Sequence, residues 1–445
     1  MMRQLKLMIA GLCFLSLILD TACVSPEGRS RRSEAIRFLP PTSAAEPPGA
    51  EALSDTLPIP DTGLRIYVFN VGQADATFVV GPSPDFHTLL VDLGEPVGHR
   101  PGNFREVARR VEEITGETHI DYFLASHFHS DHVGGDGSGI AGLIDESGFT
   151  IGTVIDFGET GQEFIPSSRG TYHAFERNLA RWLTSGKVTN RERPRFGTGQ
   201  IDLSPTNGPR VIVDILASAG SVYDGDDGAL AEVAASEPER YADAPASEND
   251  LSIAMEISYG DFEFFTAGDL TGAEYRAGRA PAQYTHRQYG DRGQTYTNVE
   301  SRLAAQWQAI DRESDVEVCR VNHHGSAHSS LPDLVNRLDP EFMIYSTGGK
   351  YGHPSRPVVE RGVATAWQLV TTKASRSTWP AAQPFEDYGE VVGEVLIEVS
   401  GDGAWYWING ETHKAYSDDE EDGGEVSEGG SGQDVDEEYT IWVDE

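Results

Sequence analysis

Short apolar runs bounded by glycine and polar residues follow one another from residue 64 onward. They are rich in β-branched and aromatic residues, which is typical of consecutive strands. The first three are LRIYVFNVG, ATFVVG and TLLVDLG, residues 64–72, 76–81 and 88–94. The segment FREVARRVEEIT then places Val107, Val111 and Ile114 at helical spacing, before the apolar run IDYFLASH returns to a buried strand. The pattern predicts strands, a helix and a further strand.

The same alternation continues to residue 410. Helices are predicted at YHAFERNLARWLTSG, near 298–311, and at LPDLVNRL and RPVVERGVATAWQLV. Strands are predicted at GTVIDFG, PRVIVDILAS, LSIAMEISYG, FEFFTAGD, VEVCRVNHH, EFMIYST, GEVLIEVS and AWYWING. Because strands often follow strands directly, the pattern favours one α/β unit with mixed sheets.

The two ends of the chain differ from this α/β pattern. Basic residues and a short apolar run predict a signal peptide at 1–22, and Cys23 resembles the acylated cysteine of a bacterial lipoprotein. Residues 23–60 are rich in proline, alanine and serine and predict a flexible stalk. The folded domain is expected at 61–412, and 413–445 as an acidic disordered tail. These features predict an exported chain that is lipid-anchored in the envelope, or else periplasmic or extracellular.

Charge and cysteine content bear on two classes of protein, those that bind nucleic acid and those built on disulfides. The formal net charge is −37, and thirteen Asp and Glu with no Lys or Arg fall within 416–445. Outside this tail the chain is still acidic, which disfavours nucleic acid as a partner without excluding it. Of three cysteines only Cys319 lies outside the two N-terminal segments, so a disulfide framework is excluded. The membrane is expected as a partner only through Cys23, and no oligomeric state is indicated.

The stretch ASHFHSDHVGG concentrates metal-binding side chains. His127, His129, Asp131 and His132 fall within six positions of a chain that has 13 histidines. Imidazole and carboxylate groups together suit Zn²⁺, with Mn²⁺ or Fe²⁺ as alternatives. Four such groups directly after a strand are too close to serve one small ion and still admit substrate. They predict two neighbouring divalent ions.

His-x-His-x-Asp-His after a buried strand resembles the signature of the metallo-β-lactamase fold. Further stretches resemble one branch of it, the hydrolase domain of ComEC DNA-uptake proteins and their secreted relatives. These stretches are FNVGQADATFV, LLVDLG, FFTAGD, VNHHGSAHSS and STGGKYGHPS. The resemblance covers about residues 64–370 and implies an αββα sandwich of two mixed β-sheets.

The resemblance also implies roles for individual residues. His127 and His129 would hold one metal, Asp131 and His132 the other, and Asp269 would bridge both. Gln73, Asp75 and Asp92 would support the site from behind the ligands. Many members of the fold add a histidine between the first cluster and Asp269, but only His173 lies there, in a helical pattern typical of a surface residue.

The missing ligand is therefore expected from the histidine pair at 323–324. His323 is expected as a ligand, and His324 as a ligand or a catalytic group behind the ligands. His353 is expected to act in catalysis, as a ligand or as a contact to the substrate oxyanion. Asp131 would orient the attacking group or accept its proton.

Together these features predict a binuclear metal-dependent hydrolase. Two cations that share a water lower its pKa to about 7, which supplies hydroxide at neutral pH. A phosphodiesterase acting on a small-molecule or envelope phosphodiester is expected. The alternatives are a DNA nuclease of ComEC type and a non-catalytic envelope binding protein. The arginine- and tyrosine-rich segment 272–297 is either a lid for an anionic substrate or a solvated loop, and the hydroxyls of SAHSS are either phosphate donors or plain loop groups.

Overall fold

The computed structural model describes residues 63–95, 103–158, 166–197, 199–223, 230–232, 248–272, 299–309, 315–363 and 365–415. The predicted signal peptide, the stalk with Cys23, residues 416–445 of the predicted acidic tail and all of segment 272–297 except Gly272 lie outside these residues. The first residues of the predicted tail, 413–415, are described, and His413 and Lys414 belong to a strand of the fold. No helix in the described ranges is long and apolar enough to cross a membrane.

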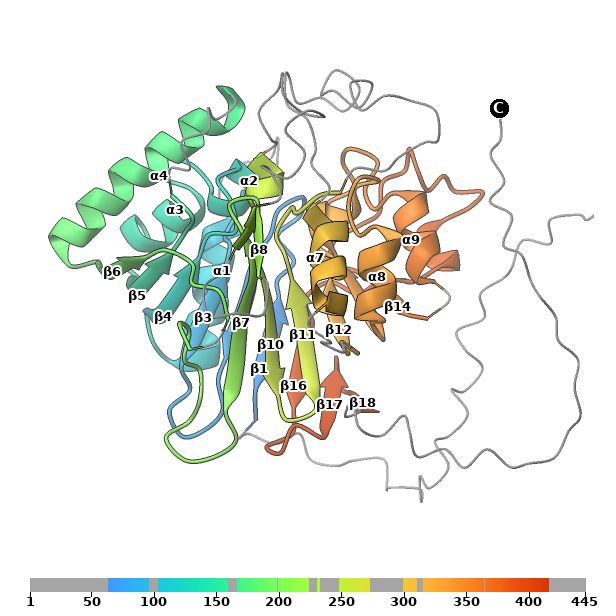
Figure 1. Cartoon of the computed structure of the whole chain (residues 1–445). Coiled ribbons are helices and arrows are strands. Elements are labelled where there is room, and N and C mark those ends of the chain that lie inside the picture. Colours follow the sequence, from blue (N-terminus) through green and yellow to red (C-terminus); the bar gives the residue numbers. More distant parts are fainter. Residues whose placement is uncertain are drawn as a thin grey trace, which may run out of the picture. The chain divides into compact units, whose positions relative to one another are not determined.

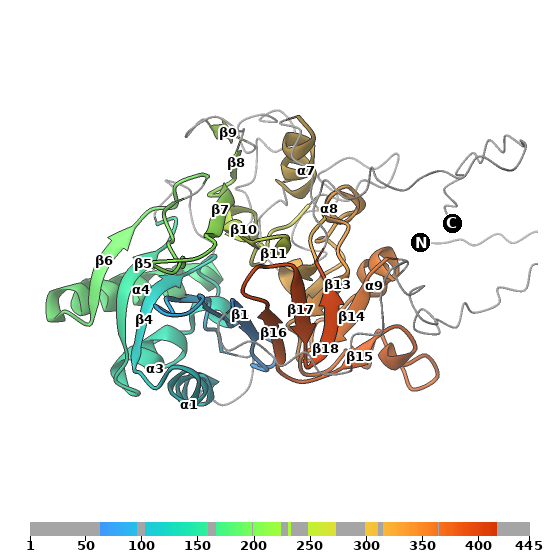
Figure 2. The same ribbon diagram turned by 90° about the horizontal axis from the view of Figure 1, so that it is seen from below.

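Two nine-stranded sheets form the centre of the described residues (Figures 1 and 2). The first contains, in spatial order, β18 (Glu411–Lys414), β17 (Trp405–Ile408), β16 (Val395–Val399), β1 (Arg65–Val68), β2 (Thr77–Val80), β3 (Thr88–Val91), β4 (His119–Leu124), β5 (Thr150–Ile155) and β6 (Val188–Glu192). The strands from β18 to β3 pair antiparallel and those from β3 to β6 pair parallel. This sheet is therefore mixed.

The second sheet repeats the combination of antiparallel and parallel pairs. Its strands in order are β15 (Glu390–Val391), β14 (Trp367–Val370), β13 (Phe342–Tyr345), β12 (Val318–Arg320), β11 (Phe262–Thr266), β10 (Ala254–Tyr259), β7 (Val211–Ser218), β8 (Ser221–Tyr223) and β9 (Leu230–Glu232). Strands β11 to β15 pair parallel, and the remaining pairs are antiparallel. Tyr259 pairs with Phe262 across a tight turn at Gly260 and Asp261.

Helices cover the outer faces of both sheets. Figure 2 shows α1 (Asn103–Thr115), α3 (Gly139–Asp145) and α4 (Pro166–Ser185) on the first, and α7 (Val299–Ala309), α8 (Pro332–Leu338) and α9 (Arg356–Gly362) on the second. The short elements are α2 (Ser130–Val133), η1 (Glu248–Leu251), η4 (Asn322–Gly325) and η5 (Phe385–Asp387). Buried apolar side chains from both sheets form one core cluster. The predicted αββα sandwich with two mixed sheets is confirmed.

One predicted helix is wrong in its second half. The pattern of RPVVERGVATAWQLV predicted a single helix, but α9 ends at Gly362 and strand β14 begins at Trp367. A Cβ at Gly362 would lie 2.1 Å from the Met343 sulfur, so this turn packs directly on β13. The apolar residues that follow pair parallel with β13, and this pairing outweighs their helical spacing.

Candidate metal centre

The ends of four parallel-paired strands bring the candidate residues together. In the first sheet Asp92 follows β3, and the segment 126–133 follows β4. In the second sheet Asp269 follows β11, and the pair at 323–324 follows β12. Because carboxyl ends of parallel strands share one sheet edge, side chains far apart in sequence meet there.

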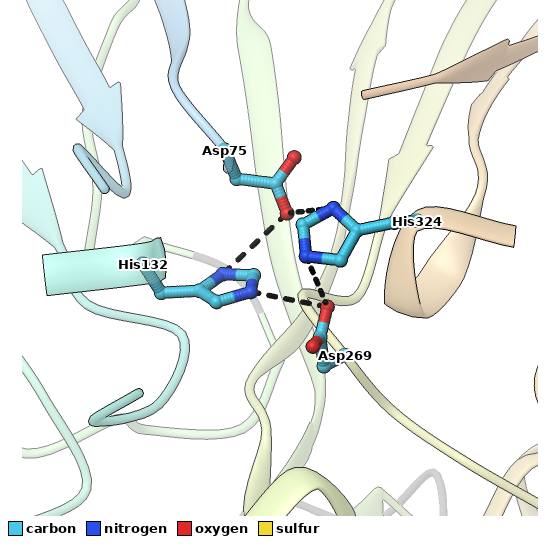
Figure 3. A group of neighbouring side chains, drawn as sticks. All are labelled: Asp75, His132, Asp269 and His324. Carbon is cyan, nitrogen blue, oxygen red and sulfur yellow. Dashed lines mark ion pairs between the residues drawn. The ribbon is translucent and has the colours of Figure 1, made fainter. Parts of the chain in front are cut away.

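Four buried side chains form the first group, drawn in Figure 3: Asp75, His132, Asp269 and His324. One carboxylate oxygen, Asp269 Oδ1, lies 3.1 Å from His132 Nε2 and 3.7 Å from His324 Nε2. These three atoms are buried and make no aligned hydrogen bond among the described residues. Asp131 Oδ2 lies 3.6 Å from the same His324 nitrogen. The imidazole nitrogens and carboxylate oxygens thus converge as around a cation.

The second group uses the other oxygen of the same carboxylate. Asp269 Oδ2 lies 3.9 Å from His127 Nε2 and 3.6 Å from His323 Nε2. His129 Nδ1 lies 2.9 Å from His127 Nε2. His127, His129 and Asp269 are close enough to hold one ion. Asp269 therefore presents one oxygen to each group of histidines.

Hydrogen bonds on the far side of the rings fix which nitrogen faces the centre. His132 Nδ1 lies 2.8 Å from Asp92 Oδ2, and His324 Nδ1 donates to the Ser346 carbonyl at 2.7 Å. His127 Nδ1 contacts the Ser126 hydroxyl at 3.1 Å, and that hydroxyl donates to Asp92. Such contacts hold ring orientation and tautomer in metal sites.

Asp75 lies behind the two rings of the first group. Its Oδ2 is 3.4 Å from His132 Nδ1 and 3.8 Å from His324 Nδ1, on the side of the rings away from Asp269 (Figure 3). The same oxygen is ion-paired with the fully buried Arg320. Asp75 can complete a four-residue ligand set by distance alone, but this pairing and position place it behind the ligands.

The charged groups of the centre shift one another's pKa values. Burial opposes ionisation of Asp269, but the surrounding His132, His324 and His323 hold the pKa of this carboxyl well below its usual range. Burial also opposes a charge on His132, yet Asp269 and Asp92 raise the pKa of His132 well above its usual value. Burial would raise the pKa of Asp131, but His324 and His132 lower it to about 2. The ionised carboxylates of this buried centre would stabilise a bound cation.

His353 is held at the edge of the centre by Gln73. The Gln73 Oε1 atom accepts hydrogen bonds from the Thr347 hydroxyl and from the amides of Gly348 and Lys350, at 3.0 to 3.2 Å. Its Nε2 therefore donates to His353 Nδ1 at 3.2 Å. Burial and the neighbouring histidines keep the pKa of His353 well below its usual value, so the ring is neutral with the proton on Nε2.

Glycines allow the backbones to approach at the centre. A Cβ at Gly94 would lie 1.6 Å from the Asp131 carbonyl oxygen. Gly268 has a φ of +53°, and a Cβ there would lie 2.4 Å from the Ser126 hydroxyl. Both positions therefore require glycine, directly beside Asp131 and Asp269.

Every residue that the sequence predicted for the metal positions lies in this centre, with the three predicted supporting residues behind it. His173 is exposed on α4, as predicted. The sequence did not reveal η1, whose Glu248 accepts a hydrogen bond from the Phe128 amide and whose Asn249 lies 3.3 Å from His323 Nε2. The polar run ENDLS directly before the apolar β10 is the signal that could have found it.

Comparison with known proteins yields distant structural similarity. No family model matches the chain, and no curated protein matches it. Solved structures align with it at low identity, and three of them are as follows. The diiron β-hydroxylase CmlA from Streptomyces venezuelae is 15% identical with a TM-score of 0.35, covering 70% of this chain and 54% of CmlA. Zn²⁺-bound PqqB from Methylobacterium extorquens is 11% identical with a TM-score of 0.34, covering 70% and 98%. A diphosphatase from the PhnP family is 11% identical with a TM-score of 0.32, covering 68% and 94%.

This chain spans about half the length of CmlA. What the geometry supplies is a buried cluster of histidines and carboxylates that can hold metal.

Proposed function

We propose that this chain is a binuclear metal-dependent hydrolase that cleaves phosphodiester bonds. The observation that carries the proposal is Asp269, whose two carboxylate oxygens face two separate groups of histidines. A shared carboxylate is the arrangement that holds two divalent ions close together, as two-metal hydrolases require.

The two ligand sets follow from the distances. His127, His129 and His323 with Asp269 Oδ2 would hold one ion, and Asp131, His132 and His324 with Asp269 Oδ1 the other. Mixed imidazole and carboxylate donors fit Zn²⁺, with Mn²⁺ and Fe²⁺ as alternatives. The buried nitrogens of His132 and His324 that lack an aligned hydrogen bond fit this assignment. When bound, two adjacent divalent ions act as Lewis acids and lower the pKa of water to about 7.

Asp131 is suited to handle the proton of the attacking water. Its side chain is 17% exposed whereas that of Asp269 is 3% exposed, so of these two carboxylates it is the one that water can reach. The carboxylate can accept the proton from water as the new P–O bond forms. The same proton can pass to the leaving alcohol oxygen when the old P–O bond breaks, so the carboxylate is regenerated.

His353 is suited to bind the substrate. Its ring centroid lies 5.8 Å from that of His323 and 6.2 Å from that of His324. Since Gln73 donates to Nδ1, the Nε2–H is left to donate a hydrogen bond to a phosphoryl oxygen. Between the two roles expected for His353, this hydrogen bond favours the contact to the substrate oxyanion over metal ligation.

Metal analysis and a substrate panel test the proposal. Purified protein is expected to contain two divalent ions per chain and to hydrolyse bis-p-nitrophenyl phosphate in a chelator-sensitive manner. Asp131→Ala should abolish turnover, whereas His173→Ala, an exposed histidine of α4, should not. Cleavage of DNA would favour the nuclease alternative. Protein without metal or turnover on any phosphodiester would contradict the proposal and leave the binding-protein alternative.

The proposed setting is the cell envelope. The N-terminal pattern of the sequence supports export, with anchoring at Cys23. Labelling with a radioactive fatty acid, compared between the natural chain and Cys23→Ser, would test the anchor. Unchanged labelling would overturn it.

A further inference from the structure

The double-histidine turn η4 has an unusual backbone. His323 and His324 have φ angles of +50° and +53°, and Gly325 follows at +79°. The left-handed region is disfavoured for residues other than glycine, and two such residues in succession persist only where the surroundings hold them. Ser330, seven residues after His323, also has a positive φ of +49°. The whole segment 322–331 therefore needs external support.

One carboxylate connects both ends of this segment. Glu300, in the first turn of α7, is fully buried. Its Oε1 accepts hydrogen bonds from Asn322 Nδ2 at 2.8 Å and from the Ser330 amide at 2.7 Å. Its Oε2 accepts a hydrogen bond from the Leu331 amide at 2.9 Å. The residue before His323 and the residues that close the segment thus share one buried acceptor group.

Two further groups hold the same segment from within and from α9. The Ser329 hydroxyl contacts the carbonyl oxygens of Asn322 and Ser326, both at 2.8 Å. The Arg361 guanidinium donates to the carbonyl oxygens of Ser329 and Ser330, both at 3.0 Å. The Ser329 hydroxyl is therefore engaged within the loop rather than free for a phosphate. Glu300 and Arg361 supply an acceptor and a donor to one closed loop.

The closed loop decides where the two histidine rings lie. The His323 amide donates to the Gly268 carbonyl at 3.0 Å, which joins the turn to the residue before Asp269. From there His323 Nε2 reaches Asp269 Oδ2, and His324 Nε2 reaches Asp269 Oδ1. An ordinary helical or extended backbone would send these neighbouring side chains in different directions.

We propose that Glu300 is the positioning residue of the double-histidine turn, and that it holds one histidine for each of the two metal ions. This inference rests on the proposed two-metal function. Glu300 is not one of the residues that would hold either ion, and it acts by keeping Asn322, Ser330 and Leu331 in place around His323 and His324.

The test compares Glu300→Gln with Glu317→Gln. Glu317 is also buried and accepts a backbone hydrogen bond, from Glu263, but it lies at the opposite end of β12 from the histidines. Each variant is loaded with Co²⁺, and its affinity is measured by chelator competition together with the visible absorption spectrum. Glu300→Gln is expected to weaken the binding of both Co²⁺ ions by roughly 10- to 100-fold and to alter the visible absorption spectrum. Glu317→Gln should match the natural protein in both measurements.

A second readout requires no metal. Amide hydrogen exchange in metal-free protein should be faster within 322–331 in Glu300→Gln and unchanged in β4 and β5. If Glu300→Gln does not fold, Asn322→Ala, which leaves Glu300 its two backbone donors, should show the same effects in weaker form.

Natural Co²⁺ affinity and spectrum in a folded Glu300→Gln protein, with only a lower melting temperature, would show a merely structural role and overturn the inference. A natural protein that binds no Co²⁺ would instead overturn the proposed function, and with it this role. The two failures are therefore distinguishable.

Discussion

Two loops, one from each sheet, build opposite sides of the centre in different ways. The first, 126–133 after β4, carries four candidate ligands and includes the short helix α2. The second, 322–331 after β12, carries two candidate ligands on consecutive left-handed residues. The candidate ligands of the first loop are visible in its local sequence, although Asp92 and Glu248 also contact this loop. The second depends on contacts from α7 and α9, so its chemistry is set by distant parts of the chain.

The largest loss of metal and activity is expected from a substitution of Asp269, whose carboxylate faces histidines of both loops. Asp269→Asn removes the charge that both groups share, so both ions should be lost and hydrolysis should fall by about 1,000-fold or more, since metal stabilisation of several kcal/mol disappears. Metal content by mass spectrometry and turnover of a chromogenic phosphodiester measure this. Retention of both ions would mean that the two loops hold their metals independently.

Removal of a single ligand from either loop should affect one of the two ions and not the other. His129→Ala in the first loop and His324→Ala in the second are each expected to reduce the bound metal from two ions to one per chain, with most of the activity lost. Metal content after dialysis measures the stoichiometry. If either variant loses both ions while the other loses one, the ligand sets assigned from the distances are wrong.

The backbones of the two loops should respond differently to the same substitution. In the second loop, a Cβ at Gly325 would lie 2.7 Å from the Tyr345 ring and 2.9 Å from Pro354, at a φ of +79°. Just after the first loop, a Cβ at Gly135 would lie 3.7 Å from the Ser138 hydroxyl. Gly325→Ala should lower the free energy of unfolding by about 2 kcal/mol, and Gly135→Ala by less than about 0.5 kcal/mol. Equal losses in denaturant titrations would contradict this contrast.

The second loop should also introduce a dependence on pH. Burial raises the pKa of Glu300 from 4.5 to about 7, against the lowering effect of Asn322, two backbone donors and Arg361. Between these values the unfolded chain releases the Glu300 proton while the folded chain keeps it, so stability falls as pH rises, by up to about 3 kcal/mol. Above pH 7 both states are ionised and this contribution stays constant.

Urea titrations between pH 4.5 and 8 of the natural protein and of Glu300→Gln measure this term. The variant should lack the decline, so the stability of the natural protein relative to the variant should fall as pH rises to about 7. Parallel curves would show that Glu300 does not titrate in this range.

The two loops also explain how far the sequence could predict the site. The density of His127, His129, Asp131 and His132 was visible because local spacing carries it. An α/β unit with mixed sheets was likewise predictable from the alternating patterns, and the resemblance to the metallo-β-lactamase fold implied the αββα sandwich. The strand conformation of residues 367–370 was not predictable, because it depends on pairing with β13.

Glu300, Arg320 and η1 escaped prediction for another reason. Each is an ordinary polar residue or short polar run in sequence, and each acquires its place only when distant strands and helices pack together. The places of Asp75 behind the ligands and of Asp131 among them were implied by the resemblance and not by the residue pattern alone.

Adjacent histidines that serve different ions make the two binding events thermodynamically linked. Glu300 and Arg361 hold the turn before metal binds, so only its remaining motion is lost when the first ion binds either His323 or His324, and the second ion then meets a fully ordered turn. If both ions bind as proposed, their uptake should be cooperative, with a singly loaded protein sparsely populated at intermediate metal concentrations. The left-handed turn would thus favour the loading of both ions together.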